Sequence, residues 1–166
     1  MRPVKTVYIV RHAKSSWDNF ELSDHDRPLM NTGIKKTKKV ISFLASKKVM
    51  PDVMLTSSAV RAQETAKLIA TGIGYNHDEI VVCKALYHAG IEEIYDEIAS
   101  LDDKFNSVMI FGHNPMLTYF VNSFVVPEID NFPTTGVLSV DFKANSWESI
   151  SNAKFKVNFV VFPRML

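Results

Sequence analysis

Short apolar runs alternate with segments of helical periodicity along most of this chain, and that alternation limits the folds open to it. The first run, Val4–Val10, is rich in β-branched and aromatic residues, as is typical of a buried parallel strand. Further strands are expected at Asp52–Thr56, Glu79–Cys83 and Val108–Phe111. Such a succession predicts an α/β fold, in which a mostly parallel sheet lies between helices on both faces.

The segments between these runs carry apolar residues at intervals of three and four. Helices are expected over 34–45 and over 91–99, where the spacing i, i+3, i+4, i+7, i+8 is complete. The tail changes character, because 136–142 and 155–162 have the pattern of two strands joined by a turn region. A three-layer α/β/α sandwich is therefore predicted, and a length of 166 residues suits a single domain, 1–166.

The composition narrows the possible partners and location. With a net charge of +1, the chain lacks the concentrated basic surface that nucleic-acid binding needs. Its one basic cluster, in 34–39, alternates with apolar residues at helical spacing and is interpreted as a solvated helix face. No run approaches the ~18 apolar residues of a membrane span. The first ten residues are too short for a signal peptide, and Cys83 is alone, so a cytoplasmic protein is expected.

Two histidines and two arginines stand where the predicted strands end. Arg11 and His12 directly follow the first strand, His113 follows the fourth, and Arg61 lies near the start of the helix after the second. Ligands of open α/β sheets collect outside the carboxyl ends of the strands. Because neighbouring parallel strands place these ends side by side, we expect the four side chains to converge in one pocket.

These residue types favour an anion over a metal. Two forked guanidinium groups and two imidazoles suit a tetrahedral dianion. Arginine does not ligate metals, and no carboxylate lies at metal-ligand spacing from either histidine, so no metal and no cofactor are expected. The Gly-x-Ser-x-Gly elbow of serine hydrolases does not occur, and Ser57-Ser58 is interpreted as capping or hydrogen-bonding residues.

The motifs that contain these residues resemble those of the histidine phosphatase superfamily. Each motif is weak by itself, but together they occur in the order found in that family, between Val4 and about Gly136. The first motif and the Asp-x-x-Arg-Pro-Leu loop are similar to those of the small SixA-type phosphohistidine phosphatases. The matching stretches are Arg11-His12-Ala13-Lys14-Ser15-Ser16-Trp17, Asp26-Arg27-Pro28-Leu29 with Gly33, Ser57–Ala66 and Gly112-His113-Asn114-Pro115.

The resemblance implies a phosphoglycerate mutase-like fold and a role for each residue. His12 matches the residue that takes the phosphoryl group. Arg11 and Arg61 match the two phosphate-clamping arginines, and His113 matches the second histidine of the pocket. Hydrolysis would then proceed in two steps through a covalent phosphohistidine intermediate.

The proton donor is where this sequence departs from the wider family. Many members carry a glutamate after the third strand, whereas here the stretch is Leu86-Tyr87-His88-Ala89-Gly90. His88 is a candidate donor or an exposed loop residue, and Glu92 fits better as a residue of the first helical turn. Lys14 is placed at the phosphate rim or in solvent. Asn114 is expected to cap its helix or to touch phosphate.

The connection between 13 and 32 is the longest in the chain and is expected to form part of the pocket wall. Asp26 and Arg27 are interpreted as an ion pair that braces it. Trp17 is expected to pack beneath it or to contact substrate, and His25 to face solvent.

Three functions remain open from the sequence. The leading hypothesis is a metal-independent phosphatase that acts on phosphohistidine in a protein through phospho-His12. A phosphoramidate can leave as neutral imidazole and so depends less on a proton donor, which typically contributes ~10²–10⁴-fold. The alternatives are a small-molecule phosphomonoesterase, with His88 or a carboxylate from Asp18–Asp26 as the acid, and a phosphate-recognition module without turnover.

Overall fold

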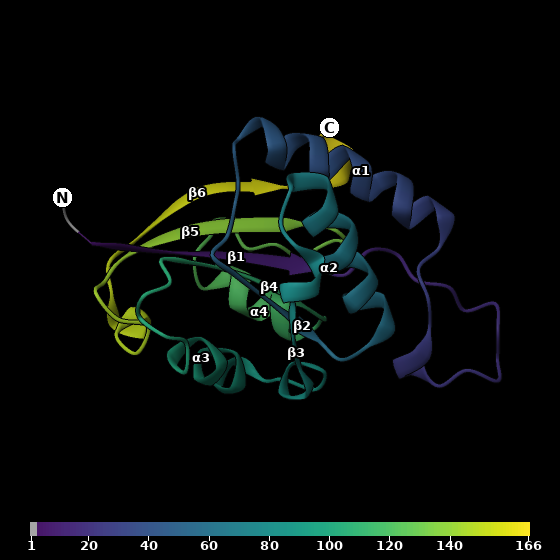
Figure 1. Ribbon diagram of the computed structural model, residues 1–166, viewed down its shortest axis with the longest axis horizontal. Coiled ribbons are helices and arrows are strands. Elements are labelled where there is room, and N and C mark those ends of the chain that lie inside the picture. Colours follow the sequence, from purple (N-terminus) through teal and green to yellow (C-terminus); the bar gives the residue numbers. More distant parts are fainter. Residues whose placement is uncertain (1–2) are drawn as a thin grey trace.

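A computed structural model describes residues 3–166, which build a six-stranded sheet with helices on both faces (Figure 1). The strand order is β3-β2-β4-β1-β5-β6. The first four strands are parallel to one another, and β5 runs antiparallel to both β1 and β6. The predicted three-layer α/β/α sandwich is confirmed. Its strands and α-helices are β1 (Val4–Arg11), α1 (Asn31–Ser46), β2 (Val53–Ser57), α2 (Val60–Ile73), β3 (Val81–Cys83), α3 (Ile91–Ala99), β4 (Ser107–Gly112), α4 (Met116–Asn122), β5 (Val137–Lys143) and β6 (Phe155–Val161).

Alternation along the strands divides the core into two halves. On β4, Val108 and Ile110 enter one apolar cluster while Met109 and Phe111 enter the other, as the two-residue period of a strand requires. Residues of α3 and α4 cover the first cluster, and residues of α1 and α2 cover the second. Among the helices of residues 3–166, none is both long enough and apolar enough to cross a membrane.

The helix after β2 starts later than the capping interpretation of Ser57-Ser58 suggests. Its N-cap is Ala59 and not one of the two preceding serines, and its first residue is Val60. Ser57 instead accepts a hydrogen bond from the Ala59 amide with its hydroxyl oxygen, at 3.2 Å. The helix ends at Ile73, where Gly74 adopts a left-handed conformation with φ of 88°, which glycine tolerates because it lacks a Cβ.

The register of β1 and β4 sets the two histidine positions side by side. Arg11 is opposite Gly112, and the amide of His12 donates to the carbonyl of Gly112 at 3.2 Å. On the other side of β1, the amide of Thr135 lies 3.0 Å from the Arg11 carbonyl and 3.2 Å from that of His12. The backbone of the Arg11-His12 pair is therefore held between two segments that lie about 100 residues further along the chain.

Gly33, in the first turn of α1, lies against the backbone of Lys14. A Cβ at this position would stand 2.5 Å from the Lys14 carbonyl oxygen and 2.9 Å from its amide nitrogen. Because backbone cannot turn aside as a side chain can, Gly33→Ala is expected to lower the free energy of unfolding by about 1–3 kcal/mol, measured by urea denaturation.

Gly112→Ala at the end of β4 is the matched control for this prediction. Its Cβ would meet only the side chain of Leu117, at 3.7 Å, which is an ordinary van der Waals contact. The control should lose less stability than Gly33→Ala. Equal losses in the two variants would contradict the importance of the backbone contact.

Candidate active site

The four residues singled out at the strand ends line one open pocket of about 510 Å³. Arg11 closes β1 and His12 follows it, Arg61 lies in the first turn of α2, and His113 follows β4. The ring centroids of the two histidines are 5.1 Å apart. The structure thus brings together at one edge of the sheet the side chains that the sequence placed there.

His12 is buried, with 6% of its surface exposed, and its ring is held in one orientation. Nδ1 lies 2.7 Å from the carbonyl oxygen of Ala13, which can only accept, so Nδ1 carries the proton and the lone pair is on Nε2. The Ala13 amide donates to Thr65 Oγ1 at 2.9 Å, and Thr65 donates to the Arg61 carbonyl at 2.7 Å. These bonds connect the His12 loop to the helix that carries Arg61.

Both histidines are neutral at physiological pH. Burial, together with the nearby arginine charges, lowers the pKa of His12 to about 4, although its bond to the Ala13 carbonyl opposes the shift. Burial and the neighbouring His12 and arginines lower the pKa of His113 to about 3. A neutral imidazole keeps the Nε2 lone pair that a nucleophile requires.

Three buried nitrogen atoms of the pocket have no hydrogen-bond partner. They are Nε of Arg11, Nε of Arg61 and Nδ1 of His113, and within residues 3–166 the only other buried side-chain nitrogen or oxygen in this state is Nε1 of Trp147. A buried donor without a partner costs about 1–3 kcal/mol. Three of the four central residues of the pocket therefore carry an unsatisfied polar atom in the free protein.

His113 has Ser57 as its hydrogen-bond partner. Ser57 Oγ lies 2.7 Å from Nε2 of His113 and also accepts a bond from the Ala59 amide. When the Ser57 hydroxyl donates to Nε2, the ring proton is on Nδ1, the atom left without a partner. In the other tautomer Nε2 carries the proton and donates to Ser57.

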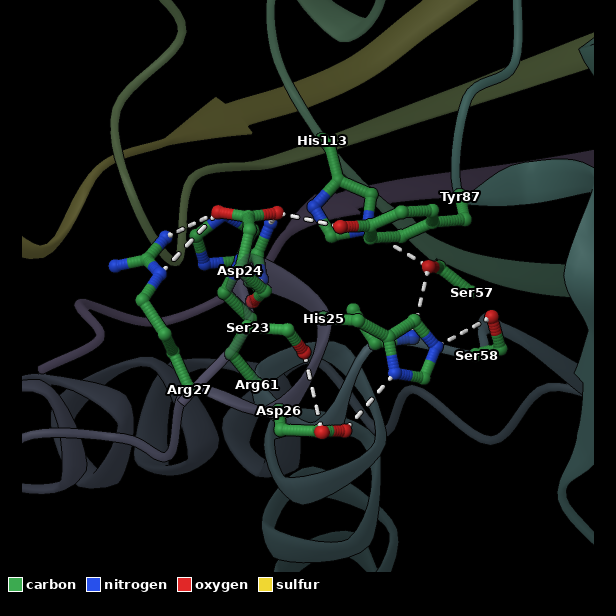
Figure 2. Close-up of polar contacts among 12 residues, drawn as sticks. Ser23, Asp24, His25, Asp26, Arg27, Ser57, Ser58, Arg61, Tyr87 and His113 are labelled. Carbon is green, nitrogen blue, oxygen red and sulfur yellow. Dashed lines mark hydrogen bonds and ion pairs between the residues drawn. The ribbon is translucent and has the colours of Figure 1, made fainter. Parts of the chain in front are cut away.

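Asp24 provides the negative charge next to these cations. Arg61 donates from Nη1 to the Asp24 carbonyl at 2.6 Å and from Nη2 to its carboxylate at 3.0 Å. The Tyr87 hydroxyl donates to the same carboxylate at 2.5 Å, and Figure 2 shows Asp24 between Arg27 and Tyr87. The bond from Tyr87 and the two arginine charges lower the pKa of Asp24 to about 2. Asp24 is therefore ionised and cannot serve as a proton donor near neutral pH.

The prediction that Asp26 forms an ion pair with Arg27 is wrong. Arg27 is paired with Asp24, with Nε and Nη2 both 3.2 Å from Oδ1, because these residues are three apart around the 3₁₀ turn Asp24–Asp26. Asp26 instead contacts Ser23 and His25. The side chain of His25 is 40% exposed, as expected, and its Nε2 also lies 3.0 Å from Ser58 Oγ.

The cationic wall of the pocket is larger than the sequence indicated. Besides the two central arginines, Lys14, Arg27 and Lys36 line it, and none of the lining residues in the described chain is a carboxylate. Lys36 belongs to the basic cluster that was expected to face only solvent. The helical pattern placed it correctly on the polar face, but the pattern alone did not show that this face borders the pocket.

Trp17 does not pack beneath its loop as expected. Its side chain is 68% exposed and lines the pocket mouth, and the Arg27 guanidinium lies 3.4 Å from the ring centroid. Such stacking is favourable for arginine because its planar cation meets the negative face of the ring.

Two further predicted site residues, Asn114 and His88, have contacts that set them apart from the central four. Asn114 lines the pocket, but its side-chain amide donates to Asn131 and Phe132 and its oxygen accepts from Thr118, so it acts as a brace at the start of α4. His88 is exposed, packs edge-on against Tyr87 and lines a separate hollow beside His113. A proton-donor role for His88 stays a prediction.

Sequence reasoning included Asp24 and Ser57 only in broader sets and gave neither its own role. Asp24 lay in the range Asp18–Asp26 considered for the acid, and its spacing to Arg27 in the Asp-x-x-Arg-Pro-Leu pattern was the signal for the ion pair. Ser57 was interpreted as a capping or hydrogen-bonding residue, and the structure shows its hydrogen bonds with Ala59 and His113. Within residues 3–166, no three His, Cys, Asp or Glu side chains are grouped as metal ligands would be.

Comparison with known families agrees with this geometry. The model of the histidine phosphatase superfamily (branch 1) matches residues 7–95, which include three of the four central pocket residues. The chain belongs to this superfamily. An uncharacterized chloroplastic protein of Arabidopsis thaliana is 30% identical to it over 120 residues, which are 66% of this chain and 54% of that protein. The chain thus spans about half the length of that relative.

Solved structures of superfamily members share the fold of this one. The SixA protein of Agrobacterium tumefaciens, to which phosphohistidine phosphatase activity is attributed, superposes with a TM-score of 0.80 at 24% identity and covers 97% of this chain and 99% of its own. The protein histidine phosphatase SixA in complex with tungstate has a TM-score of 0.80 at 23% identity, with 96% and 98% covered. A phosphoglycerate mutase from Bacillus anthracis reaches 0.60 at 12%, with 90% and 96% covered. The phosphoglycerate mutase-like fold is confirmed.

The low pKa of His12 has a consequence for stability in acid. Its folded pKa of about 4 lies below the unfolded value of 6.5, so the unfolded chain binds a proton more readily and stability falls as pH drops below 6.5. Between about pH 7.5 and about pH 5 this one group should cost about 2 kcal/mol. We expect His12→Gln to lose about that much less than the native chain over this interval, measured by urea denaturation at both pH values. His77→Gln, at an exposed histidine, should behave as the native chain does.

The negative charge of Asp24 opposes anion binding in the pocket. Asp24→Asn removes this charge but keeps an oxygen that accepts from Arg61, so the affinity for orthophosphate should rise about 3- to 10-fold at low salt, measured by calorimetry. Asp24→Ala also removes the contact that orients Arg61 and should bind more weakly than Asp24→Asn. If both variants lost affinity equally, the carboxylate would act by orienting Arg61 and not by its charge.

Proposed function

We propose that this protein is a metal-independent phosphatase that hydrolyses phosphohistidine on a protein through a covalent phospho-His12 intermediate. The observation that carries the proposal is the state of His12, a buried neutral imidazole with Nε2 free in a pocket lined by cations. The arginines supply the positive charge that phosphoryl transfer requires.

In the first step, Nε2 of His12 attacks the phosphorus of the substrate in line with the scissile bond. The N–P bond of the substrate breaks as the bond to His12 forms, and the departing imidazole nitrogen takes a proton from solvent. Arg11 and Arg61 with their positive charge, and His113 with a ring N–H, stabilise the three equatorial oxygens. Preorganised donors of this kind are effective because they need no reorganisation during the reaction.

In the second step, water attacks the phosphorus of phospho-His12. The P–N bond to Nε2 breaks, inorganic phosphate leaves, and the water proton goes to the phosphate or to solvent. The bond from Nδ1 to the Ala13 carbonyl persists throughout, so the ring returns to the tautomer in which it began. The pocket is open to solvent, which gives water access to the intermediate.

The ionised state of Asp24 favours a substrate whose leaving group can depart without a strong proton donor. An alkyl phosphate expels an alkoxide and needs a proton donor, whereas phosphohistidine is protonated on nitrogen and leaves as neutral imidazole. The carboxylate closest to this side, Asp24, is ionised and held by Arg61 and Tyr87. The absence of carboxylates among the described lining residues supports the same preference.

The fold likeness to SixA structures adds support. One of those structures, described as a protein histidine phosphatase, holds tungstate, a tetrahedral dianion. Other structures with this fold act on small phosphate esters, among them a mycobacterial glucosyl-3-phosphoglycerate phosphatase with a TM-score of 0.62. A small-molecule phosphomonoesterase is therefore the rival activity, and the substrate comparison must include such compounds.

The proposed intermediate is tested by rapid quench with a labelled phosphohistidine donor. We expect an acid-labile, base-stable label on His12, carried on Nε2 because Nδ1 is committed to Ala13, and ³¹P NMR of the trapped protein distinguishes the two isomers. His12→Ala should carry no label, whereas His77→Ala, at an exposed histidine, should be labelled normally.

Unchanged labelling of His12→Ala would refute the intermediate. Faster turnover of sugar or aryl phosphates than of every phosphohistidine substrate would favour the rival phosphomonoesterase. Phosphate binding without release of inorganic phosphate from any substrate would instead establish a recognition module.

A further inference from the structure

We infer that the loop over residues 16–28, called the arm below, is the surface on which the phosphorylated protein docks. This inference rests on the proposed function and adds the position and chemistry of the contact. In Figure 1 the arm stands out beyond the carboxyl end of β1, away from the rest of the molecule. Three of its large apolar side chains are exposed, with Trp17 at 68%, Phe20 at 97% and Leu22 at 38%.

The arm is anchored and does not form a loose loop. At its base, Ser15 and Leu29 form a β-bridge, and the Ser16 amide donates to the Pro28 carbonyl at 2.8 Å. Further along, Asp24 is held by Arg61. The exposed apolar side chains are thus presented on a backbone that is fixed at both ends, which lowers the entropy lost when a partner binds.

The arm continues directly from the pocket. Trp17 lines the pocket mouth and stacks on Arg27, which lines it as well, whereas Phe20 and Leu22 are not among the lining residues. A metabolite enclosed by the pocket would therefore leave Phe20 and Leu22 in water. A protein with its phosphohistidine in the pocket extends past the mouth and can cover them.

Exposed apolar residues this close together usually mark an interaction site, and aromatic side chains contribute most at protein interfaces. The charged residues next to these apolar side chains indicate the charge of the partner's surface. Asp18 and Glu21 are exposed on either side of Phe20. The surface thus fits a folded protein that presents a small apolar patch beside its phosphohistidine, with basic groups around that patch.

The test compares substrates of different size on one double variant, Phe20→Ser with Leu22→Ser. Histidine-containing phosphotransfer proteins, phosphorylated chemically with phosphoramidate, serve as protein substrates, and free phosphohistidine and p-nitrophenyl phosphate serve as small ones. We expect kcat/KM to fall at least about 10-fold for the preferred protein substrate, mainly through KM. Turnover of both small substrates should stay within about twofold, because neither residue lines the pocket.

Met50→Ser is the matched control. Met50 is an exposed apolar residue, 49% exposed, that precedes the amino end of β2, at the edge of the sheet opposite the pocket. All substrates should be turned over by this variant as by the native protein. Thermal unfolding of Phe20→Ser alone should match that of the native chain, since Phe20 is almost fully exposed, and this single variant should show the same selective loss on protein substrates.

Each other outcome has a definite meaning. Equal losses on protein and small substrates would show that the arm acts on the pocket and would refute docking. Unchanged turnover of the protein substrates by the double variant would also refute it, while leaving the proposed function in place. If the native protein hydrolysed p-nitrophenyl phosphate but no phosphohistidine, the proposed function would fail, and docking of a histidine-phosphorylated protein with it.

Discussion

The site depends on positive charge that is buried beside very little negative charge. Burial and the nearness of Arg61 lower the pKa of Arg11, which shows that the two guanidinium groups repel each other in a poorly solvated place. Asp24 offsets part of this repulsion from one side of Arg61 and leaves the Nε atoms of both arginines without partners. The free protein therefore holds an incomplete hydrogen-bond network beside two like charges. The proposed phosphoryl transfer would use the same excess of positive charge to hold the anionic substrate.

The fold was predictable because backbone geometry sets the period at which side chains repeat in strands and in helices. Strand residues alternate between faces and helix residues repeat about every 3.6 positions, so the apolar pattern of this chain determines where each element can lie. The four central pocket residues were predictable for a related reason, since each stands at the carboxyl end of a parallel strand or in the segment that follows it. The order of the strands was not readable from the same pattern, because neighbouring strands such as β2 and β4 are both buried along nearly their whole length.

The partners of the charged residues were harder to predict. The Asp26-Arg27 pair looked natural in the sequence because its members are adjacent, yet adjacent residues in a turn point in different directions, while residues three apart meet. Lys36 shows a second limit. The helical pattern placed Lys36 on the polar face of α1. The residues next to Lys36 depend on how α1 is positioned over the end of β1, where Gly33 packs against the backbone of Lys14. Such contacts are tertiary and leave no periodic signal.

The position of β1 in the sheet also affects how the chain is made. β1 is synthesised first among the strands, yet both of its neighbours, β4 and β5, emerge about 100 residues or more later. At ~5–20 residues per second, this apolar strand waits several seconds on the ribosome without its partners. The segment that carries His12 thus spends this interval without its sheet partners, and the His12–His113 side of the pocket is completed only after β4 has emerged.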